Sequence, residues 1–222
     1  MLDYGCGAGQ IVGMLRRMGI NAHGCDVFYE GGDYSPDIPE SLRPFIQRME
    51  GTRIPCDAGS FDIVLSNQVF EHVPDMRAET AEIARVLKPG GVTFNLFPDR
   101  GVWREGHCGV PFLHRFPKGS TARIYYAALA RALGVGLHKE GKSVMQWARD
   151  FCVWLDNWTY YRPMAEIEQA FGAHFDLQHA EEEWFRARFA DRLTAMPLTL
   201  QRLIVRKFAG LVLIGIKAPL QS

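Results

Sequence analysis

The first hundred residues alternate between short apolar runs and longer segments in which apolar positions recur every three or four residues. The runs predict β-strands at 21–28, 45–49, 61–67 and 92–98, and Met1 to Asp3 form the end of another strand. The segments with the wider spacing predict helices. Strands and helices in alternation are typical of a parallel sheet with helices on both faces.

Two helices are predicted in this part of the chain, and a loop lies between them. The first helix spans residues 10–19, and its apolar face is formed by Ile11, Met14, Leu15 and Met18. The second spans residues 76–91, where Asp75 supplies an N-cap and a Pro-Gly-Gly sequence ends the helix. Residues 29–44 are rich in Gly, Pro, Asp and Ser and predict a loop.

The alternation returns near the end of the chain. A helix is predicted at 164–171, a strand at 174–181, a helical stretch at 184–207 that breaks near Pro197, and a last strand at 210–217. The predicted fold class is therefore α/β, with a doubly wound, mostly parallel seven-stranded sheet that has helices on both faces. Ligands of this architecture bind at the carboxyl ends of the strands.

Residues 99–162 do not follow the alternating pattern. They hold 11 of the 26 aromatic residues, and ten Lys and Arg against five Asp and Glu. We interpret this segment as a mainly helical insertion after the fifth strand. The chain then divides into a main domain of residues 1–98 and 163–222, with residues 99–162 inserted into it.

Composition narrows the function classes. The 222 residues carry 25 Lys and Arg and 25 Asp and Glu, and a neutral pI of about 7.0 gives no reason to expect a nucleic-acid partner. The five cysteines form no CxxC pair and no metal-ligand pattern, so we expect reduced thiols, a cytoplasmic protein and no metal. The longest apolar run has nine residues, too few for a transmembrane segment.

The sequence "LDYGCGAGQ" places glycines at positions 5, 7 and 9 after a strand and before a helix. Such a turn lets the backbone approach a ligand closely. A dinucleotide site usually reads GxGxxG, whereas this turn reads GxGxG with Asp3 just before it. A carboxylate repels a pyrophosphate and attracts a ligand that carries an ammonium and a sulfonium group, as S-adenosylmethionine does.

Four motifs together resemble the class I S-adenosylmethionine-dependent methyltransferases. They are "DYGCGAG" at 3–9, "GCD" at 24–26, "IPCDAGSFDIVLSNQVFEHV" at 54–73 and "RVLKPGG" at 85–91. The resemblance covers residues 1–98 well and 164–217 in outline, and it does not extend to the insertion. It implies a cofactor-binding domain, a small-molecule substrate and, for the insertion, a substrate lid.

The resemblance also implies cofactor contacts at individual positions. Asp3 would bind the amino group of the cofactor, Asp26 the ribose hydroxyls, and Val27 one face of the adenine. Glu50 and Gly51 occupy the positions that read the adenine edge, although neither is the usual residue. The full set of expected cofactor-binding residues is Asp3, Gly5, Gly7, Gly9, Asp26, Val27, Glu50, Gly51, Asn67 and Gln68.

The beginning of the chain departs from the family pattern. Family members usually have a complete first strand, whereas here only Met1 and Leu2 precede Asp3. We therefore expect a truncated first strand and weaker cofactor binding. The candidate catalytic residues are His107, which lies in a glycine-rich segment after the fifth strand, and His72 of the "EHV" sequence, for which a packing role is the competing interpretation.

The substrate side admits more than one interpretation. The basic surplus of the insertion favours an anionic or lipid-linked acceptor, and a solvated basic surface is the alternative. A second function class is a non-catalytic protein of methyltransferase fold that binds the cofactor or a partner. A nicotinamide-dependent oxidoreductase is disfavoured by Asp3 and by Gln10 at the place of the third dinucleotide glycine.

Overall fold

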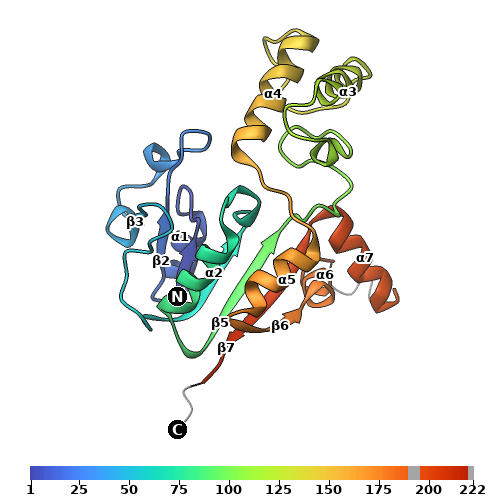
Figure 1. Cartoon of the computed structure of the whole chain (residues 1–222). Coiled ribbons are helices and arrows are strands. Elements are labelled where there is room, and N and C mark those ends of the chain that lie inside the picture. The colour runs from blue at the N-terminus through green and yellow to red at the C-terminus, as the bar shows by residue number, and fades with distance from the viewer. Residues whose placement is uncertain (190–195, 220–222) are drawn as a thin grey trace.

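The computed structural model describes residues 1–189 and 196–219, and its strands form one seven-stranded sheet of order β3-β2-β1-β4-β5-β7-β6 (Figure 1). The strands are β1 (Leu2–Tyr4), β2 (His23–Asp26), β3 (Ile46–Arg48), β4 (Phe61–Asn67), β5 (Leu87–Phe97), β6 (Phe175–His179) and β7 (Leu211–Lys217). Strand β7 is antiparallel to both of its neighbours, and the other pairings are parallel. The predicted fold class is confirmed.

The helices follow the predicted order. They are α1 (Gln10–Arg17), α2 (Met76–Val86), α3 (Thr121–Ala132), α4 (Val144–Trp158), α5 (Met164–Gly172), α6 (Glu181–Phe189) and α7 (Leu198–Phe208). In the described ranges, four short 3-10 segments lie between these strands and helices, namely η1 (Ser35–Asp37), η2 (Arg43–Phe45), η3 (Phe70–His72) and η4 (Leu113–Arg115). The stretch predicted at 184–207 thus consists of α6 and α7, and its residues 190–195 lie outside the described part of the chain.

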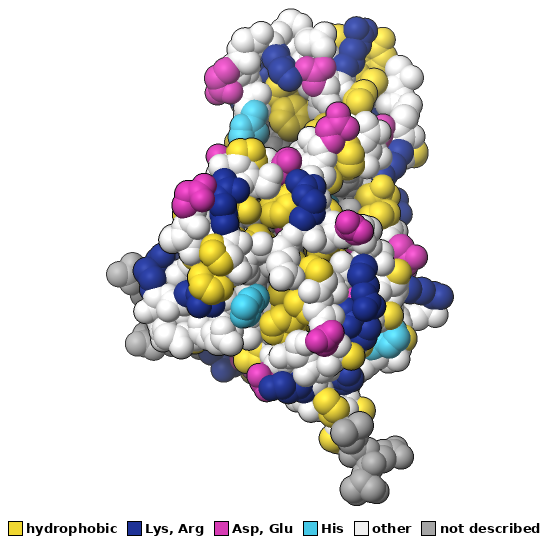
Figure 2. Space-filling model, turned by 90° about the vertical axis from the view of Figure 1, so that its left-hand side faces the viewer, with side chains coloured by type: hydrophobic (Ala, Val, Ile, Leu, Met, Phe, Trp, Pro, Cys, Tyr) yellow, Lys and Arg dark blue, Asp and Glu magenta, His cyan; other side chains and the backbone are white. Residues whose placement is uncertain are grey.

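Helices α3 and α4 of the insertion stand apart from the sheet, beyond the end toward which β5 points (Figure 1). They have their own apolar core, in which Trp147 and Leu155 of α4 are fully buried together with Leu113. From the side, this part forms a narrow lobe on a wider base (Figure 2). The insertion therefore lies over the carboxyl ends of the parallel strands, where ligands of such sheets bind.

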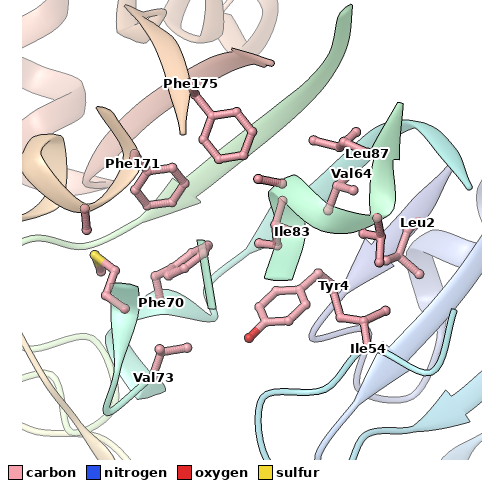
Figure 3. Packing of buried hydrophobic residues seen from close by; sticks show 14 of the residues in the cluster. Leu2, Tyr4, Ile54, Val64, Phe70, Val73, Ile83, Leu87, Phe171 and Phe175 are labelled. Carbon is pink, nitrogen blue, oxygen red and sulfur yellow. The ribbon is translucent and has the colours of Figure 1, made fainter. Parts of the chain in front are cut away.

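The main core lies between the sheet and helices α2 and α5. Phe70, which directly follows β4, is fully buried and packs against Tyr4 of β1 and Phe171 of α5 (Figure 3). The ring centroids are 5.9 Å apart for the first pair and 4.9 Å for the second. This packing fixes the start of the segment that carries Glu71 and His72.

The helix predicted at 76–91 is shorter than expected. Asp75 caps it as predicted, because its side chain accepts a hydrogen bond from the Ala78 N–H at 3.1 Å. The helix ends at Val86, however, and Leu87 is already extended and pairs with Phe61. The Pro-Gly-Gly sequence lies inside β5, where the register shifts between Phe61 and Ile63. The glycines therefore serve a strand irregularity.

The predicted apolar face of helix α1 is only partly correct, because Leu15 packs against the buried cluster whereas Met14 and Met18 do not. Val12 is its fully buried apolar side chain, and it packs in a small cluster with Cys6 and Ala22. Met14 and Met18 are 48% and 68% exposed. The reason is geometric, because the glycine turn sets the direction in which this short helix leaves β1, and Val12 then faces the sheet.

Two further sequence expectations concern the whole chain. All five cysteines are free thiols, and four of them are buried. In the ranges 1–189 and 196–219, no helix combines the length and the apolar character that crossing a lipid bilayer requires.

Candidate functional site

A cavity of about 670 Å³ lies at the carboxyl ends of β1, β2, β3 and β4, beneath the insertion. Its volume is within the usual range for small-ligand sites. Tyr4, Asp26, Met49 and Gln68 lie at or next to the ends of these four strands and line it. The sheet order changes direction between β1 and β4, so the cavity occupies the topological switch point at which doubly wound sheets bind ligands.

The glycine turn forms one wall of this cavity. Gly5 and Gly7 line it, whereas Gly9 caps helix α1 and lies behind the wall. Gly5 has a φ of +74°, and a Cβ at this position would lie 2.3 Å from the Val69 side chain. A side chain is therefore excluded at Gly5 both by its backbone conformation and by the approach of the chain that follows β4.

Asp26 connects the glycine turn to the end of β2. One carboxylate oxygen accepts a hydrogen bond from the Gly7 N–H at 2.8 Å, and the other accepts one from the Phe28 N–H at 2.9 Å. A carboxylate has about four acceptor positions, so about two remain for a ligand. Asp26 also lines the cavity, and its free acceptor positions suit two adjacent hydroxyl groups.

Asp3 lies below the cavity wall and is 2% exposed. Its Oδ2 atom has no hydrogen-bond partner among the described residues. Burial, together with the nearby Asp26 charge, raises the pKa of Asp3 to about 7. A cationic ligand group above this carboxylate would compensate its buried charge.

The other predicted cofactor residues fall into two groups. Val27, Gly51 and Gln68 line the cavity. Glu50 and Asn67 are exposed and lie outside the cavity lining. Glu50 forms a backbone β-bridge with Arg53, and Asn67 is the last residue of β4. Sequence reasoning missed Thr52, which lines the cavity beside Gly51.

The two candidate catalytic histidines meet across the cavity. Their Nε2 atoms are 3.2 Å apart, although His72 follows β4 and His107 belongs to the insertion. Nδ1 of His72 is 2.7 Å from the Trp158 carbonyl oxygen, and Nδ1 of His107 is 2.6 Å from a Glu105 carboxylate oxygen. Both rings are thus fixed at Nδ1, and their Nε2 atoms face each other where the two residues line the cavity.

Glu105 anchors this arrangement, and the sequence analysis did not single it out. It is fully buried and accepts hydrogen bonds from the Tyr161 hydroxyl at 2.8 Å and from the Cys108 N–H at 2.7 Å. Burial opposes its charge, but the hydrogen bonds and His107 prevail and lower the pKa of Glu105 to about 2. Glu105 is therefore a carboxylate at neutral pH.

The pKa values of the two histidines move in opposite directions. Burial lowers the pKa of His72 to about 4. Burial would also lower that of His107, but the Glu105 carboxylate outweighs it and raises the pKa. Glu71, which lies beside them, is fully buried, and burial raises its pKa to about 7. One ring of the pair is therefore neutral, and the other favours a positive charge.

Aromatic residues of the insertion complete the cavity wall. Trp154 donates from its Nε1 to the Gly31 carbonyl oxygen at 3.1 Å, and the Trp158 ring lies 5.1 Å from that of Tyr29. The sequence analysis assigned no role to Trp154 and Trp158. Their spacing on α4 resembles core spacing, and only the fold shows that one side of α4 faces the cavity.

A second cavity of about 330 Å³ adjoins the first, because Tyr160 and Tyr161 line both. Its other lining includes the cationic side chains Arg100, Lys118, Arg123 and Arg162. Arg123 pairs with Asp156, and Arg162 with Glu166. In the part of the chain that the structure describes, Arg100 and Lys118 have no carboxylate partner. The cavity therefore has a positive surplus.

The first part of the chain is similar to known proteins. The family model of a methyltransferase domain matches residues 2–95. Residues 2–95 are therefore similar to methyltransferase domains, and the resemblance predicted from the four motifs is confirmed.

One similar curated protein is the ubiquinone biosynthesis O-methyltransferase of Cronobacter sakazakii. It is 29% identical over 127 residues, which are 54% of this chain and 52% of that protein. The corresponding Escherichia coli protein is 28% identical over 140 residues, which are 60% of this chain and 58% of that protein. The chain thus spans about half the length of the curated relatives it matches.

A solved structure of similar fold is the S-adenosylmethionine-dependent methyltransferase of Mesorhizobium loti. The TM-score is 0.52 at 14% identity, and the match covers 97% of this chain and 89% of that one. This likeness supports the fold.

Proposed function

We propose that this chain binds S-adenosylmethionine and transfers its methyl group to a small anionic acceptor. The observation that carries the proposal is that the glycine turn, Asp26 and the pair of His72 and His107 all line the same cavity. The family match of residues 2–95 supports the reaction class.

The residues of the wall fit this cofactor. Asp26 would accept the ribose hydroxyls with its free acceptor positions, and Val27 and Gly51 would border the adenine. Gly5 and Gly7 would border the methionine part, and the unpartnered oxygen of Asp3 would compensate its cationic end. The cofactor, when bound, supplies an activated methyl group.

The same wall disfavours a dinucleotide. A pyrophosphate needs free N–H groups in the glycine turn, and the Gly7 N–H is already donated to Asp26. Asp3 and Asp26 would also repel its charge. The donated Gly7 N–H and the two carboxylates thus favour a methyltransferase over the nicotinamide-dependent alternative.

The acceptor nucleophile would lie at the two Nε2 atoms. His72 and His107 both line the cavity and bring these atoms to 3.2 Å from each other, and Glu105 and the Trp158 carbonyl hold the rings. Methyl transfer depends chiefly on holding the nucleophile in line with the methyl group. The two rings would orient the nucleophile and take its proton.

The second cavity supports an anionic acceptor. Arg100 and Lys118 would bind its phosphate or carboxylate group, and Tyr160 and Tyr161 would border the part of the molecule that joins this group to the nucleophile. A phosphorylated or lipid-linked metabolite has this form. The positive surplus of the insertion is then concentrated at a recognition site.

A paired titration tests both halves of the proposal. In isothermal titration calorimetry, we expect the wild-type protein to bind S-adenosylhomocysteine. The resulting complex should then bind pyrophosphate in a second titration. Replacing both Arg100 and Lys118 by Ala should weaken pyrophosphate at least tenfold and leave S-adenosylhomocysteine unchanged. The matched control replaces Lys142 and Arg149, two exposed cations of the same insertion.

The outcomes are separable. Equal pyrophosphate affinity in the wild type and in the Arg100 and Lys118 variant would remove the anionic acceptor site. Failure of the wild type to bind S-adenosylhomocysteine would contradict methyl transfer itself.

A further inference from the structure

Glu71, His72 and His107 bring three potential metal ligands together at the cavity. One carboxylate oxygen and one nitrogen from each ring all lie within 4.8 Å of one another. Two of these residues are adjacent in η3, and the third comes from the insertion, 35 residues later. The sequence analysis expected no metal because the cysteines form no metal-ligand pattern, and ligands as far apart as these three form no linear motif.

The hydrogen bonds behind the rings determine which nitrogen faces the cavity with a lone pair. A carbonyl oxygen only accepts, so Nδ1 of His72 carries the proton that it donates to Trp158. Nδ1 of His107 likewise donates to the Glu105 carboxylate. In neutral rings, both Nε2 atoms then carry lone pairs, and these face each other at 3.2 Å. Two facing lone pairs need a cation between or beside them.

Glu71 provides the third ligand. The residue is 2% exposed, and its Oε2 atom lacks a hydrogen-bond partner in the ranges that the structure describes. Glu71 also lines the cavity. A buried carboxylate oxygen without a donor is costly unless a cation or a proton satisfies it.

We propose that Glu71, His72 and His107 bind a divalent transition-metal ion such as Zn²⁺ at the wall of the cavity. Two imidazoles and one carboxylate are a common ligand set of catalytic zinc sites, which keep a further position open. Ligand atoms around a tetrahedral ion lie about 3.3 Å apart, so the two nitrogens already have suitable spacing. A shift of the Glu71 carboxylate by about 1–2 Å toward the two nitrogens would complete the three-ligand set.

The surroundings have the form of a metal site. Ligating histidines generally donate their second ring N–H to a carboxylate or a backbone carbonyl. Glu105 and the Trp158 carbonyl take these two roles here. Glu105 is itself fixed by the Tyr161 hydroxyl and the Cys108 N–H, so both rings are held in place before any ion arrives.

The open position of the ion would face the cavity. If the proposed methyl transfer holds, an acceptor hydroxyl would bind there and release its proton to a water molecule in place of the histidines, because a bound cation stabilises the oxyanion. His72 and His107 would then act as ligands that place the cation at the nucleophile. The competing occupant of the site is a proton shared between the two Nε2 atoms.

Cobalt binding tests the site without any methyl acceptor. We expect metal-free wild-type protein to bind one Co²⁺ ion and to develop visible absorption bands of nitrogen and oxygen ligation, without the near-ultraviolet band of thiolate ligation. His107→Ala should abolish these bands. Glu71→Gln and Glu105→Gln, which conserve size, should weaken binding at least tenfold.

The controls separate metal binding from folding and from methyl transfer. His174→Ala, an exposed histidine outside the cavity, should bind Co²⁺ as the wild type does, and circular dichroism should show that every variant is folded. Wild-type protein without the absorption bands, or equal bands in His107→Ala, would overturn the inference and favour the shared proton. That result would leave S-adenosylhomocysteine binding intact, whereas loss of cofactor binding with intact cobalt bands would contradict only the proposed function.

Discussion

Asp3 is a residue whose buried charge lowers the stability of the ligand-free protein and suits it to bind a cationic ligand. Its carboxylate is buried beneath the cavity, and burial raises its pKa from 3.8 to about 7. The folded state therefore holds this proton more tightly than the unfolded state, and stability falls as the pH rises from about 4 to 7. A cationic ligand group bound above the Asp3 carboxylate would offset this loss of stability.

Asp3→Asn is therefore expected to stabilise the ligand-free protein. At pH 8 its free energy of unfolding should exceed that of the wild type by about 1–2 kcal/mol, and the difference should shrink toward pH 4. Thermal or urea unfolding at several pH values measures this effect. Asp62→Asn is the control, because the hydrogen bond from Lys88 lowers the pKa of Asp62 and no stabilisation should follow. A pH-independent difference for Asp3→Asn would contradict the argument.

At the residue scale, sequence and structure agree where a motif carries the information. The glycines, Asp26 and the two histidines were predicted because each belongs to a short pattern with a chemical reason. Glu105 and Thr52 were not, because an isolated acid or threonine has no distinguishing neighbours in the sequence, and Glu71 was passed over although it begins the "EHV" sequence. Their roles arise from hydrogen bonds and burial that only the fold creates.

At the element scale, the turn between β1 and α1 controls the cavity. Gly5 has a positive φ and lies directly against Val69, which follows β4. The turn therefore fixes the spacing between the two strands at the topological switch point. The same turn directs α1 so that Val12 is buried and Met14 is exposed.

Gly5→Ala is expected to be strongly destabilising. The left-handed backbone and the overlap with Val69 should together lower the free energy of unfolding by about 2–4 kcal/mol. Gly59→Ala is a matched control, because its φ is +66° and nothing lies within 4 Å of its Cβ position. It should cost only about 1–2 kcal/mol. Urea unfolding of both variants measures the two costs, and equal costs would show that the contact with Val69 is unimportant.

The predicted elements differ from the observed ones mainly at their ends. Helix α2 ends at Val86 because Leu87 joins the sheet, although the Pro-Gly-Gly sequence predicted that the helix would end later. Local signals such as caps and glycines indicate that an element ends nearby. The competition between helix and strand at Leu87 depends on pairing with Phe61, a residue that is distant in the sequence.

At the scale of the whole molecule, the site joins two parts of the chain. The sheet supplies the cofactor wall, and the insertion supplies Glu105, His107 and the aromatic side chains opposite. Both parts were predicted from composition and periodicity. The contact between the two parts was not predicted, because the proximity of His72 and His107 depends on how the insertion folds over the strand ends.

The central claim is that the cavity binds S-adenosylmethionine through Asp26 and the glycine turn. Calorimetric titration with S-adenosylmethionine, S-adenosylhomocysteine and NAD tests it most directly. We expect wild-type protein to bind the two sulfur ligands and not NAD, and we expect Asp26→Ala to weaken both at least tenfold while the exposed-acid control Asp57→Ala does not. Preferential NAD binding, or unchanged affinity in Asp26→Ala, would contradict it.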